Sequence, residues 1–345
     1  MSGHPQSWAQ VTALSLLLMP VSWLYGIVVA LRRALYVAGI LRSERVPVPV
    51  IVVGNISVGG TGKTPLVLWL ADYLLASGFT PGIVSRGYRK SGNASGENAP
   101  RAVGATDDAY QCGDEPVLLA RRSGCPVWIG ADRVAASRAL LAAHPQCNVI
   151  LSDDGLQHYR LARDVEIAVV DGMRRFGNCL LLPAGPLREP LSRLDTVDAV
   201  VIRRDDRPPD TSGGRPAPRF AMRLEAGMFR NLLHPQTVVD AGHFRGQRVH
   251  AAAGIGNPEH FFNTLKELGL EFTAHPFPDH HVYAQADLAF ADGSAVVMTE
   301  KDAVKYERYS SEATEKCWAL GVTAQVDVGL GNLLVKLIEN SRRNH

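Results

Sequence analysis

The 345-residue sequence has little cysteine and almost no net charge. Its five cysteines are odd in number and scattered, without Cys-x-x-Cys spacing, so they predict neither a disulfide framework nor a zinc site and fit a reducing compartment. A formal net charge of +2 does not indicate a nucleic-acid partner. No repeat or low-complexity tract is present. With 46% hydrophobic residues the chain can bury a large core, and its length predicts two domains.

Charged residues are missing altogether between Trp8 and Leu31. Four arginines follow this apolar stretch: Arg32, Arg33, Arg42 and Arg45. The stretch lacks the basic start and cleavage site of a signal peptide, and its length permits a membrane span. Pro20 and nearby small residues favour instead a broken helix in the membrane interface, with a buried core helix as the alternative. We therefore predict a membrane-associated segment over residues 1–43.

Short β-branched runs alternate with longer amphipathic segments after the arginines. Strands are predicted at residues 50–53, 82–85, 127–130, 149–152, 167–170 and 199–202. Strands that are apolar on both faces and separated by helices indicate an α/β fold with a parallel sheet covered by flanking helices. A loop is predicted at residues 203–219, which are rich in proline, glycine and charge.

A second, smaller α/β unit is predicted beyond this loop. It contains strands at residues 249–253 and 295–299 and a helix capped by Asn257 and Pro258 that runs to Leu268. The predicted domains are therefore residues 44–222 and residues 223–345, with a final helix that can pack back on the first domain.

A glycine-rich loop, Gly59-Gly60-Thr61-Gly62-Lys63-Thr64-Pro65, follows the strand at 50–53 and precedes a helical pattern at 66–75. This arrangement predicts an NTPase-like P-loop, in which backbone amides and the helix N-terminus hold phosphate oxygens. Lys63 would bridge the terminal phosphates, and Thr64 would hold Mg²⁺. A strict P-loop pattern has glycine where Ser57 stands, so a simple glycine-rich turn is the alternative.

Two adjacent carboxylates, Asp153 and Asp154, follow the strand at 149–152. Because a P-loop needs an acidic partner on a neighbouring strand to organise Mg²⁺, they are the predicted metal ligands. Successive strand side chains point in opposite directions, so one aspartate is expected to reach the metal, and which one stays open. Taken alone, Asp-Asp-Gly is typical of a turn.

Eight motifs occur in the order seen in one enzyme family. They are GNISVGGTGKTP (54–65), SRGY (85–88), GDEP (113–116), SDDGLQH (152–158), LPAGPLREP (182–190), GIGNP (254–258), DHH (279–281) and TEKDAVK (299–305). Together they resemble tetraacyldisaccharide 4′-kinase, the lipid A 4′-kinase family, over most of the chain beyond residue 45. Ser57 belongs to that family's own P-loop.

The resemblance implies transfer of the γ-phosphate of ATP to the 4′-hydroxyl of an acylated glucosamine disaccharide 1-phosphate. It places the enzyme at the cytoplasmic face of the bacterial inner membrane, anchored by the N-terminal segment. ATP, Mg²⁺, this lipid and the membrane surface are the implied partners. No obligate protein partner is evident.

Site residues follow from the same resemblance. Asp114 is the expected base for the sugar hydroxyl, with His280 as its polarising partner. Catalytic roles are also expected for Lys63 and Arg188. Nucleotide contacts are expected at Gly59, Gly60, Thr61, Gly62, Lys63, Thr64, Arg133 and Gln157. Metal contacts are expected at Thr64, Asp153, Asp154 and Glu189. His158 is expected to line the same cleft, and no chemistry is assigned to residues 299–305.

Each of these roles has a plainer alternative. Asp114 can cap a helix, and His280 with His281 can be an ordinary polar loop. Arg133, Arg188 and Glu189 can form surface ion pairs. A membrane-bound ATPase switch with a deviant P-loop shares the loop and the tether, but its signature lysine would stand at Val58. A passive nucleotide-binding module would not need Asp114, His280 and Arg188 together.

Overall fold

The computed structural model of the chain describes residues 8–87, 99–203, 217–291, 293–309 and 312–344. Its α-helices are α1 (Ala13–Val37), α2 (Lys63–Ala76), α3 (Ala109–Cys112), α4 (Asp114–Ser123), α5 (Arg133–Ala143), α6 (Pro258–Glu267), α7 (Glu300–Tyr306), α8 (Glu312–Glu315) and α9 (Val328–Asn344). Short 3-10 helices span Leu191–Thr196, Ala241–Phe244 and Gln285–Ala291. Its strands are β1 (Val50–Gly54), β2 (Pro81–Ser85), β3 (Arg101–Val103), β4 (Val127–Ile129), β5 (Val149–Asp153), β6 (Val165–Asp171), β7 (Ala199–Arg203), β8 (Arg219–Asn231), β9 (Val238–Val239), β10 (Val249–Ala253), β11 (Thr273–Pro276), β12 (Ala295–Thr299) and β13 (Cys317–Val326).

All of these strands belong to one mixed sheet, in the order β11-β10-β12-β13-β8-β7-β6-β1-β5-β2-β4-β3, with β9 paired to β8. The central pairs are parallel, as the apolar runs predict. Antiparallel pairs occur at β3–β4, β8–β9 and β8–β13, so a purely parallel sheet was too simple an expectation. The predicted α/β fold with a P-loop NTPase-like sheet and flanking helices is confirmed.

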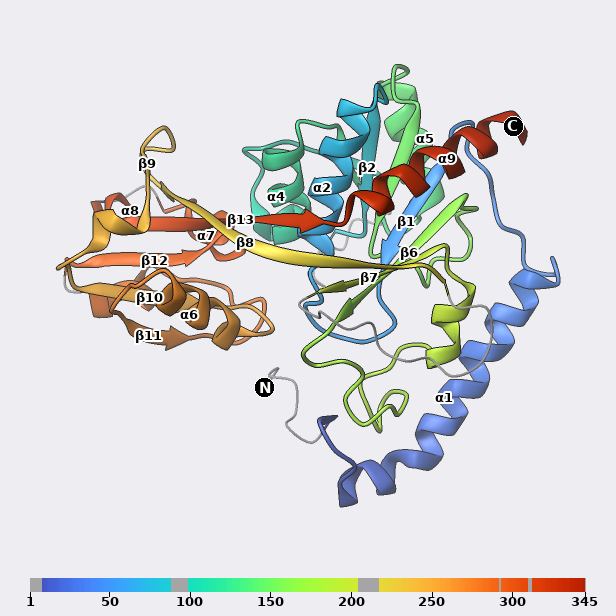
Figure 1. Cartoon of the computed structure of the whole chain (residues 1–345), viewed down its shortest axis with the longest axis horizontal. Helices are drawn as coiled ribbons and strands as arrows, with labels where there is room; N and C mark the ends of the chain where they lie inside the picture. Colours follow the sequence, from blue (N-terminus) through green and yellow to red (C-terminus); the bar gives the residue numbers. More distant parts are fainter. Residues whose placement is uncertain (1–7, 88–98, 204–216, 292, 310–311, 345) are drawn as a thin grey trace.

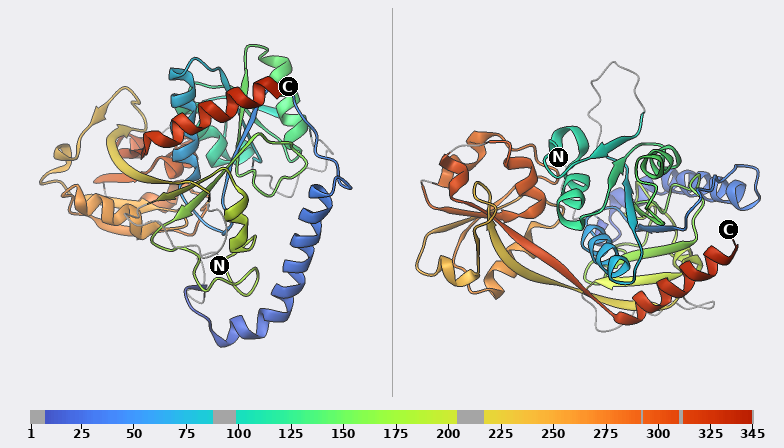
Figure 2. Two further views of the ribbon diagram at one scale, coloured as in Figure 1. Left: turned by 45° about the vertical axis from the view of Figure 1, so that its right-hand side comes forward. Right: turned by 90° about the horizontal axis from the view of Figure 1, so that it is seen from above.

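The long strands β8 and β13 join the two halves of the molecule (Figure 1). They pair over most of their length, and α9 returns along the half that carries the P-loop, where it contacts α2 and β6 (Figure 2). The predicted boundary between residues 222 and 223 falls inside β8. The predicted loop at 203–219 lies largely outside the described residues.

The strand β1 shows how the sequence builds the core. Ile51 and Val53 lie in one apolar cluster with α2, α4 and α9, whereas Val50 and Val52 lie in a second cluster with α5. Since successive strand side chains face opposite sides, this alternation buries both faces of the sheet. Helices on both faces leave only the strand ends open for a binding site.

The helix α1 lies along the side of the P-loop half, away from β10–β12 (Figure 1). It is one continuous helix with Pro20 inside, which bends in its N-terminal part (Figures 1 and 2) but is not broken into two helices as expected. Proline removes a single intrahelical hydrogen bond, which the remaining turns tolerate. By length and composition alone, it is the one described helix that could cross a membrane. Only 11% of its most apolar window is buried, which excludes the core-helix alternative.

Candidate active site

The P-loop lies between the carboxyl end of β1 and the start of α2, where three features of the sequence shape it. Gly62 has φ +95° at the cap of α2, a conformation that side chains rarely adopt. The Asn55 amide donates to Thr61 Oγ1 at 3.3 Å and so braces the loop from within. Ser57 pairs with Leu187 through an isolated backbone bridge, so a glycine is not needed there. The free amides of the first helical turn therefore face an anion site.

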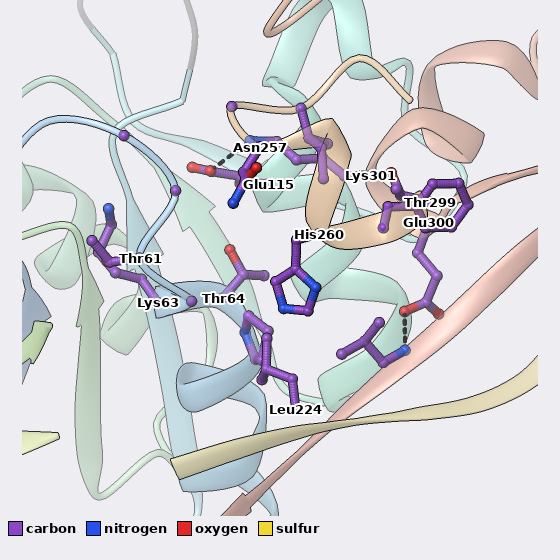
Figure 3. A pocket seen from close by; sticks show the side chains of 18 of the residues that line it. Thr61, Lys63, Thr64, Glu115, Leu224, Asn257, His260, Thr299, Glu300 and Lys301 are labelled. Atoms are coloured by element: carbon purple, nitrogen blue, oxygen red, sulfur yellow. Dashed lines mark hydrogen bonds and ion pairs between the residues drawn. The ribbon is translucent and has the colours of Figure 1, made fainter. Parts of the chain in front are cut away.

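A pocket opens between the P-loop and the second half of the chain. Its walls include the predicted residues Gly59, Gly60, Thr61, Gly62, Lys63, Thr64, Asp154, Arg188 and His280. Figure 3 shows Lys63 and Thr64 on one side, with His260, Asn257 and Lys301 reaching in from the other. Apolar side chains such as Leu68, Leu224 and Phe261 line the remainder. One cavity therefore combines a phosphate cradle with an apolar wall.

The two adjacent aspartates have different environments. Asp154 Oδ2 lies 3.2 Å from Arg188 and its Oδ1 lies 3.5 Å from Lys63 Nζ. Burial raises the pKa of Asp154, but Lys63 and Arg188 outweigh it and lower the pKa. Asp153 is buried, and burial together with Glu115 and Asp154 raises its pKa to about 7. Its Oδ1 has no hydrogen-bond partner among the described residues, while Ser85 donates to its Oδ2.

The backbone of Asp154 has φ +48° and that of His280 has φ +56°. Both lie in the left-handed region that non-glycine residues rarely occupy. Such conformations persist where surrounding contacts over-determine them, and they concentrate at functional sites. Two of the predicted site residues therefore carry local strain.

Asp114 and His280 come from opposite halves of the chain and meet beside the P-loop. His280 Nδ1 lies 3.2 Å from Asp114 Oδ2, and the amide of Glu115 donates to Asp114 Oδ1. Asp114 is buried behind His280, which lines the pocket. Burial raises the pKa of Asp114, but Lys301 and His280 lower it well below its usual range. The hydrogen bond from Asp114 raises the pKa of His280.

Lys301 completes this cluster, and the sequence analysis missed it. Its Nζ lies 2.9 Å from Glu115 Oε1 and 3.7 Å from Asp114 Oδ2. Burial lowers the pKa of Lys301, but Glu115 and Asp114 raise it above its usual value, so it is a permanent cation. Its only sequence signal was its place in the 299–305 motif, which carried no assigned chemistry.

Two further residues of that motif, Asp302 and Lys305, hold the loop that forms one wall of the pocket. Buried Asp302 accepts the amide of Gly254 at 3.0 Å and lies 2.7 Å from Lys305 Nζ. Lys305 in turn donates to the Gly254 carbonyl at 3.4 Å. The loop held in this way contributes Ile255, Gly256 and Asn257 to the pocket. The motif therefore shapes the wall that faces the P-loop.

Several predicted residues lie next to the pocket without lining it. Arg133 is buried and donates to the Gly130 carbonyl at 2.8 Å, and burial lowers its pKa to about 10. Gln157 donates to the Asn55 carbonyl at 3.0 Å and to Glu189 at 3.2 Å. Burial, followed by Arg133 and Arg163, lowers the pKa of His158 to about 4, which leaves it neutral.

Glu189 differs most from its expected place in the metal shell. Its Oε1 accepts the Tyr159 hydroxyl, and its Oε2 accepts Gln157 and lies 3.6 Å from Arg193 Nε. Tyr159, Gln157 and Arg193 thus occupy the carboxylate, which does not line the P-loop pocket. His281 pairs with Asp287 at 2.7 Å. Tyr88 lies outside the described residues.

A pocket lined by a P-loop, by Asp154 at the end of the neighbouring strand and by His280, with Asp153 and Asp114 buried beside it, defines a phosphotransferase of the P-loop class. The model of the family described as "Tetraacyldisaccharide-1-P 4'-kinase" matches residues 14–339. The chain belongs to this family and is a kinase of lipid A biosynthesis.

Relatives and a solved structure agree along the whole chain. The tetraacyldisaccharide 4'-kinase of Azoarcus sp. (strain BH72) is 50% identical over 98% of this chain and 96% of its own length. That of Nitrosococcus oceani is 47% identical over 99% and 94%. The crystal structure of LpxK from Aquifex aeolicus in complex with ATP superposes with a TM-score of 0.79 at 31% identity, covering 94% of this chain and 99% of that one.

Proposed function

We propose that the chain phosphorylates the 4′-hydroxyl of a tetraacylated glucosamine disaccharide 1-phosphate with ATP, at the cytoplasmic face of the inner membrane. The observation that carries the proposal is the shared pocket. The P-loop lysine Lys63 and the pocket-facing His280, backed by Asp114, line one cavity although they come from opposite halves of the chain. A phosphoryl donor on one wall and a proton acceptor on the other suit transfer to a hydroxyl.

The P-loop half binds and orients the donor. Amides of Gly60, Thr61 and Gly62 and the N-terminus of α2 face the phosphates, and Lys63 adds a positive charge. Arg188 is anchored by Asp154 and keeps its planar guanidinium in the pocket wall. Arginine in this position neutralises charge that develops on the transferred group while it fixes direction. Half-buried Gln157 supports the start of the loop through the Asn55 carbonyl, and Arg133 is proposed to contribute positive charge near the nucleotide.

The family implies Mg²⁺, and the residues present fit it. Asp153 is a buried carboxylate whose Oδ1 lacks a hydrogen-bond partner in the described structure. Oxygen ligands suit Mg²⁺, which proteins commonly hold through one or two carboxylates together with substrate phosphates. The described ranges contain no group of three or more His, Cys, Asp or Glu side chains that could hold a metal ion by itself. We propose Thr64, Asp153 and Asp154 as its protein contacts, with Glu189 more distant. Bound Mg²⁺ supplies charge neutralisation on the β- and γ-phosphates.

Proton removal from the acceptor falls to the Asp114–His280 pair. His280 faces the pocket and Asp114 lies behind it, so the pair acts as one unit rather than through an isolated aspartate. Lys301 keeps Asp114 ionised. The negative charge of Asp114 stabilises the imidazolium that forms when His280 takes the proton of the sugar hydroxyl. The strained backbone of His280 holds the ring at this position.

The surface of α1 supports a membrane location. Its outward residues are large and apolar: Leu14, Leu16, Leu17, Val21, Trp23, Leu24, Ile27, Val28 and Leu31 are each more than half exposed. Full burial of one such side chain gains about 1.5–3 kcal/mol, so a bilayer surface stabilises this arrangement strongly. Its contacts with the protein extend from Ser15 to Arg33. A helix docked along its length lies in the membrane surface rather than across it.

The ATPase-switch alternative lacks support. Family membership extends over residues 14–339, which includes His280 and Lys301 from the second half. A switch has no use for a proton acceptor opposite the phosphates. The discriminating assay incubates the full chain with ATP, Mg²⁺ and the purified disaccharide lipid in vesicles. Phosphorylated lipid formed in proportion to ADP is expected, whereas ADP without phosphorylated lipid would refute the proposal.

A further inference from the structure

The inner face of α1 is polar and small, which reverses the usual pattern of a surface helix. Ser15 and Ser22 are its two buried residues. The Ser22 hydroxyl donates to the Leu181 carbonyl at 2.8 Å. A Cβ added to Gly26 would lie 2.8 Å from Leu181 Cδ1, so the absent side chain is what permits this close approach. The helix is therefore fitted to the segment around Leu181.

That segment continues directly into the active site. The amide of Arg188 donates to the Ile56 carbonyl at 2.7 Å, and the amide of Val58 donates to the Pro186 carbonyl at 2.9 Å. The segment thus runs beside the chain that enters the P-loop. The Arg188 side chain then reaches Asp154 in the pocket wall. A shift of this backbone would move the guanidinium relative to the phosphates.

The hydroxyl of Tyr25 forms a hydrogen bond with this backbone at Arg188. It donates to the Arg188 carbonyl at 3.0 Å across 163 positions of sequence. Arg188 is therefore held through its amide by Ile56, between β1 and the P-loop, and through its carbonyl by α1. Burial, followed by the charge of Glu189, raises the pKa of Tyr25, so the hydroxyl remains a donor at neutral pH.

A second contact runs in parallel. Arg32 donates to the Gln157 carbonyl at 3.2 Å, and the Gln157 amide donates to the Asn55 carbonyl at 3.0 Å. Asn55 is the residue that braces the P-loop through Thr61. The docked face of α1 therefore contacts both supports of the phosphate site, whereas the outward face contacts none of it.

We propose that Tyr25 is a positioning residue for phosphoryl transfer, which couples the seating of α1 on a lipid surface to the placement of Arg188. The coupling to lipid rests on the proposed function, while the bond to Arg188 stands by itself. When the apolar face of α1 inserts into the lipid surface, the position of the helix is fixed. The helix in turn fixes the Arg188 backbone through the Tyr25 hydroxyl. The N-terminal helix is then a working part of the catalytic site as well as an anchor.

The test compares Tyr25→Phe with the matched control Tyr36→Phe in the full chain. Tyr36 lies on the same helix and packs its ring on Tyr159 at 5.7 Å, and the described structure gives its hydroxyl no hydrogen bond. In vesicles that contain the acceptor lipid, Tyr25→Phe is expected to lower kcat about three- to tenfold, the worth of one positioned hydrogen bond. KM for ATP, flotation with vesicles and thermal melting should stay near those of the control.

Two results would overturn the proposal. In an Arg188→Ala background, Tyr25→Phe should cause no further loss, so additive losses would show that Tyr25 does not act through Arg188. Hydrogen exchange needs no acceptor: amides of residues 180–189 should exchange faster in Tyr25→Phe than in Tyr36→Phe. Equal exchange refutes the coupling even if the acceptor has been misassigned. A wild-type chain that fails to phosphorylate the lipid refutes the proposed function instead.

Discussion

Replacement of Lys301 by methionine tests the electrostatics of the proton acceptor. The change removes a cation 3.7 Å from Asp114 Oδ2 and 2.9 Å from Glu115 Oε1. At an effective dielectric constant of about 20, a charge pair at this longer distance is worth about 4.5 kcal/mol. One pKa unit corresponds to about 1.4 kcal/mol. A net loss of only a third of this attraction, with solvent and nearby charges offsetting the rest, therefore raises the pKa of Asp114 by about one unit.

The sign of the effect follows from the direction of the shift. Lys301 and His280 hold the pKa of Asp114 below its usual value, so the carboxylate persists to low pH. Without Lys301 the pKa of Asp114 rises, and so does the pKa of His280, which Lys301 also lowers. The imidazole that must accept the proton is then already protonated at a higher pH, so activity is lost there as the solution is acidified. Asp114 also stabilises the fold above its unfolded pKa, a contribution that the variant loses earlier on acidification. The acid limb of kcat/KM for the acceptor should therefore move toward neutral pH.

The assay is a pH profile of kcat/KM, which reports the free enzyme. Each rate is divided by the fraction of folded protein, because removing Lys301 leaves buried carboxylates without their charge partner, which costs up to about 3–5 kcal/mol of stability. Lys301→Arg keeps the charge and serves as the control, with an acid limb close to wild type. A variant with lower melting temperature but an unmoved acid limb would show that Lys301 is only structural.

The other predictions concern the phosphate site, the Asp–His pair and the anchor. Lys63→Ala should abolish most turnover with unchanged thermal melting, and near wild-type activity would remove the P-loop from the mechanism. Asp114→Asn should lower kcat more than it raises KM for either substrate, and adding His280→Ala should cause little further loss; additive losses would separate the two residues. Deletion of residues 1–43 should release the chain from vesicles, raise the acceptor KM and lower kcat at least as much as Tyr25→Phe does, with ATP binding retained. High salt should release the intact chain only in part, because insertion is not screened, so full release by salt would contradict the apolar anchor.

The arginines at the end of α1 and beyond it contribute less to that anchor than the sequence suggested. Arg32 is bonded to the Gln157 carbonyl, Arg33 to Thr196 and Arg45 to Asp164. Side chains engaged by the protein are less available to anionic headgroups than extended ones. The structure therefore shifts the expected weight from charge attraction to apolar insertion.

Local patterns were sufficient for the P-loop half of the fold. β1, β2, β5 and β7 coincide with short apolar runs because strands buried on both faces need continuous apolar residues. β8 was missed because its buried and exposed residues alternate irregularly along a run rich in arginine. Its pairing with β13 joins residues about ninety positions apart, and no local pattern encodes such a register.

The residues of the site likewise include some that local patterns predict and some that they do not. Lys63, Asp154 and Arg188 were predictable because a P-loop and a strand-end carboxylate have a fixed relation at one edge of a parallel sheet. Lys301 was not, since its contact with Glu115 spans 186 positions and depends on how the two halves meet. The metal role of Glu189 stays a prediction: its carboxylate contacts Arg193, four positions further along the chain, and the Tyr159 hydroxyl, and neither contact could be predicted from the local motif.

The continuous sheet also affects how the protein unfolds. Hydrogen bonds pass from β11 at one edge to β3 at the other, and β8 and β13 belong to both halves at once. Cutting the chain at the 222/223 junction would sever β8 within its pairing with β13 and leave two bare sheet edges, each a template for aggregation. Because neither half can melt without exposing the other, we expect thermal unfolding to be a single cooperative transition of both halves.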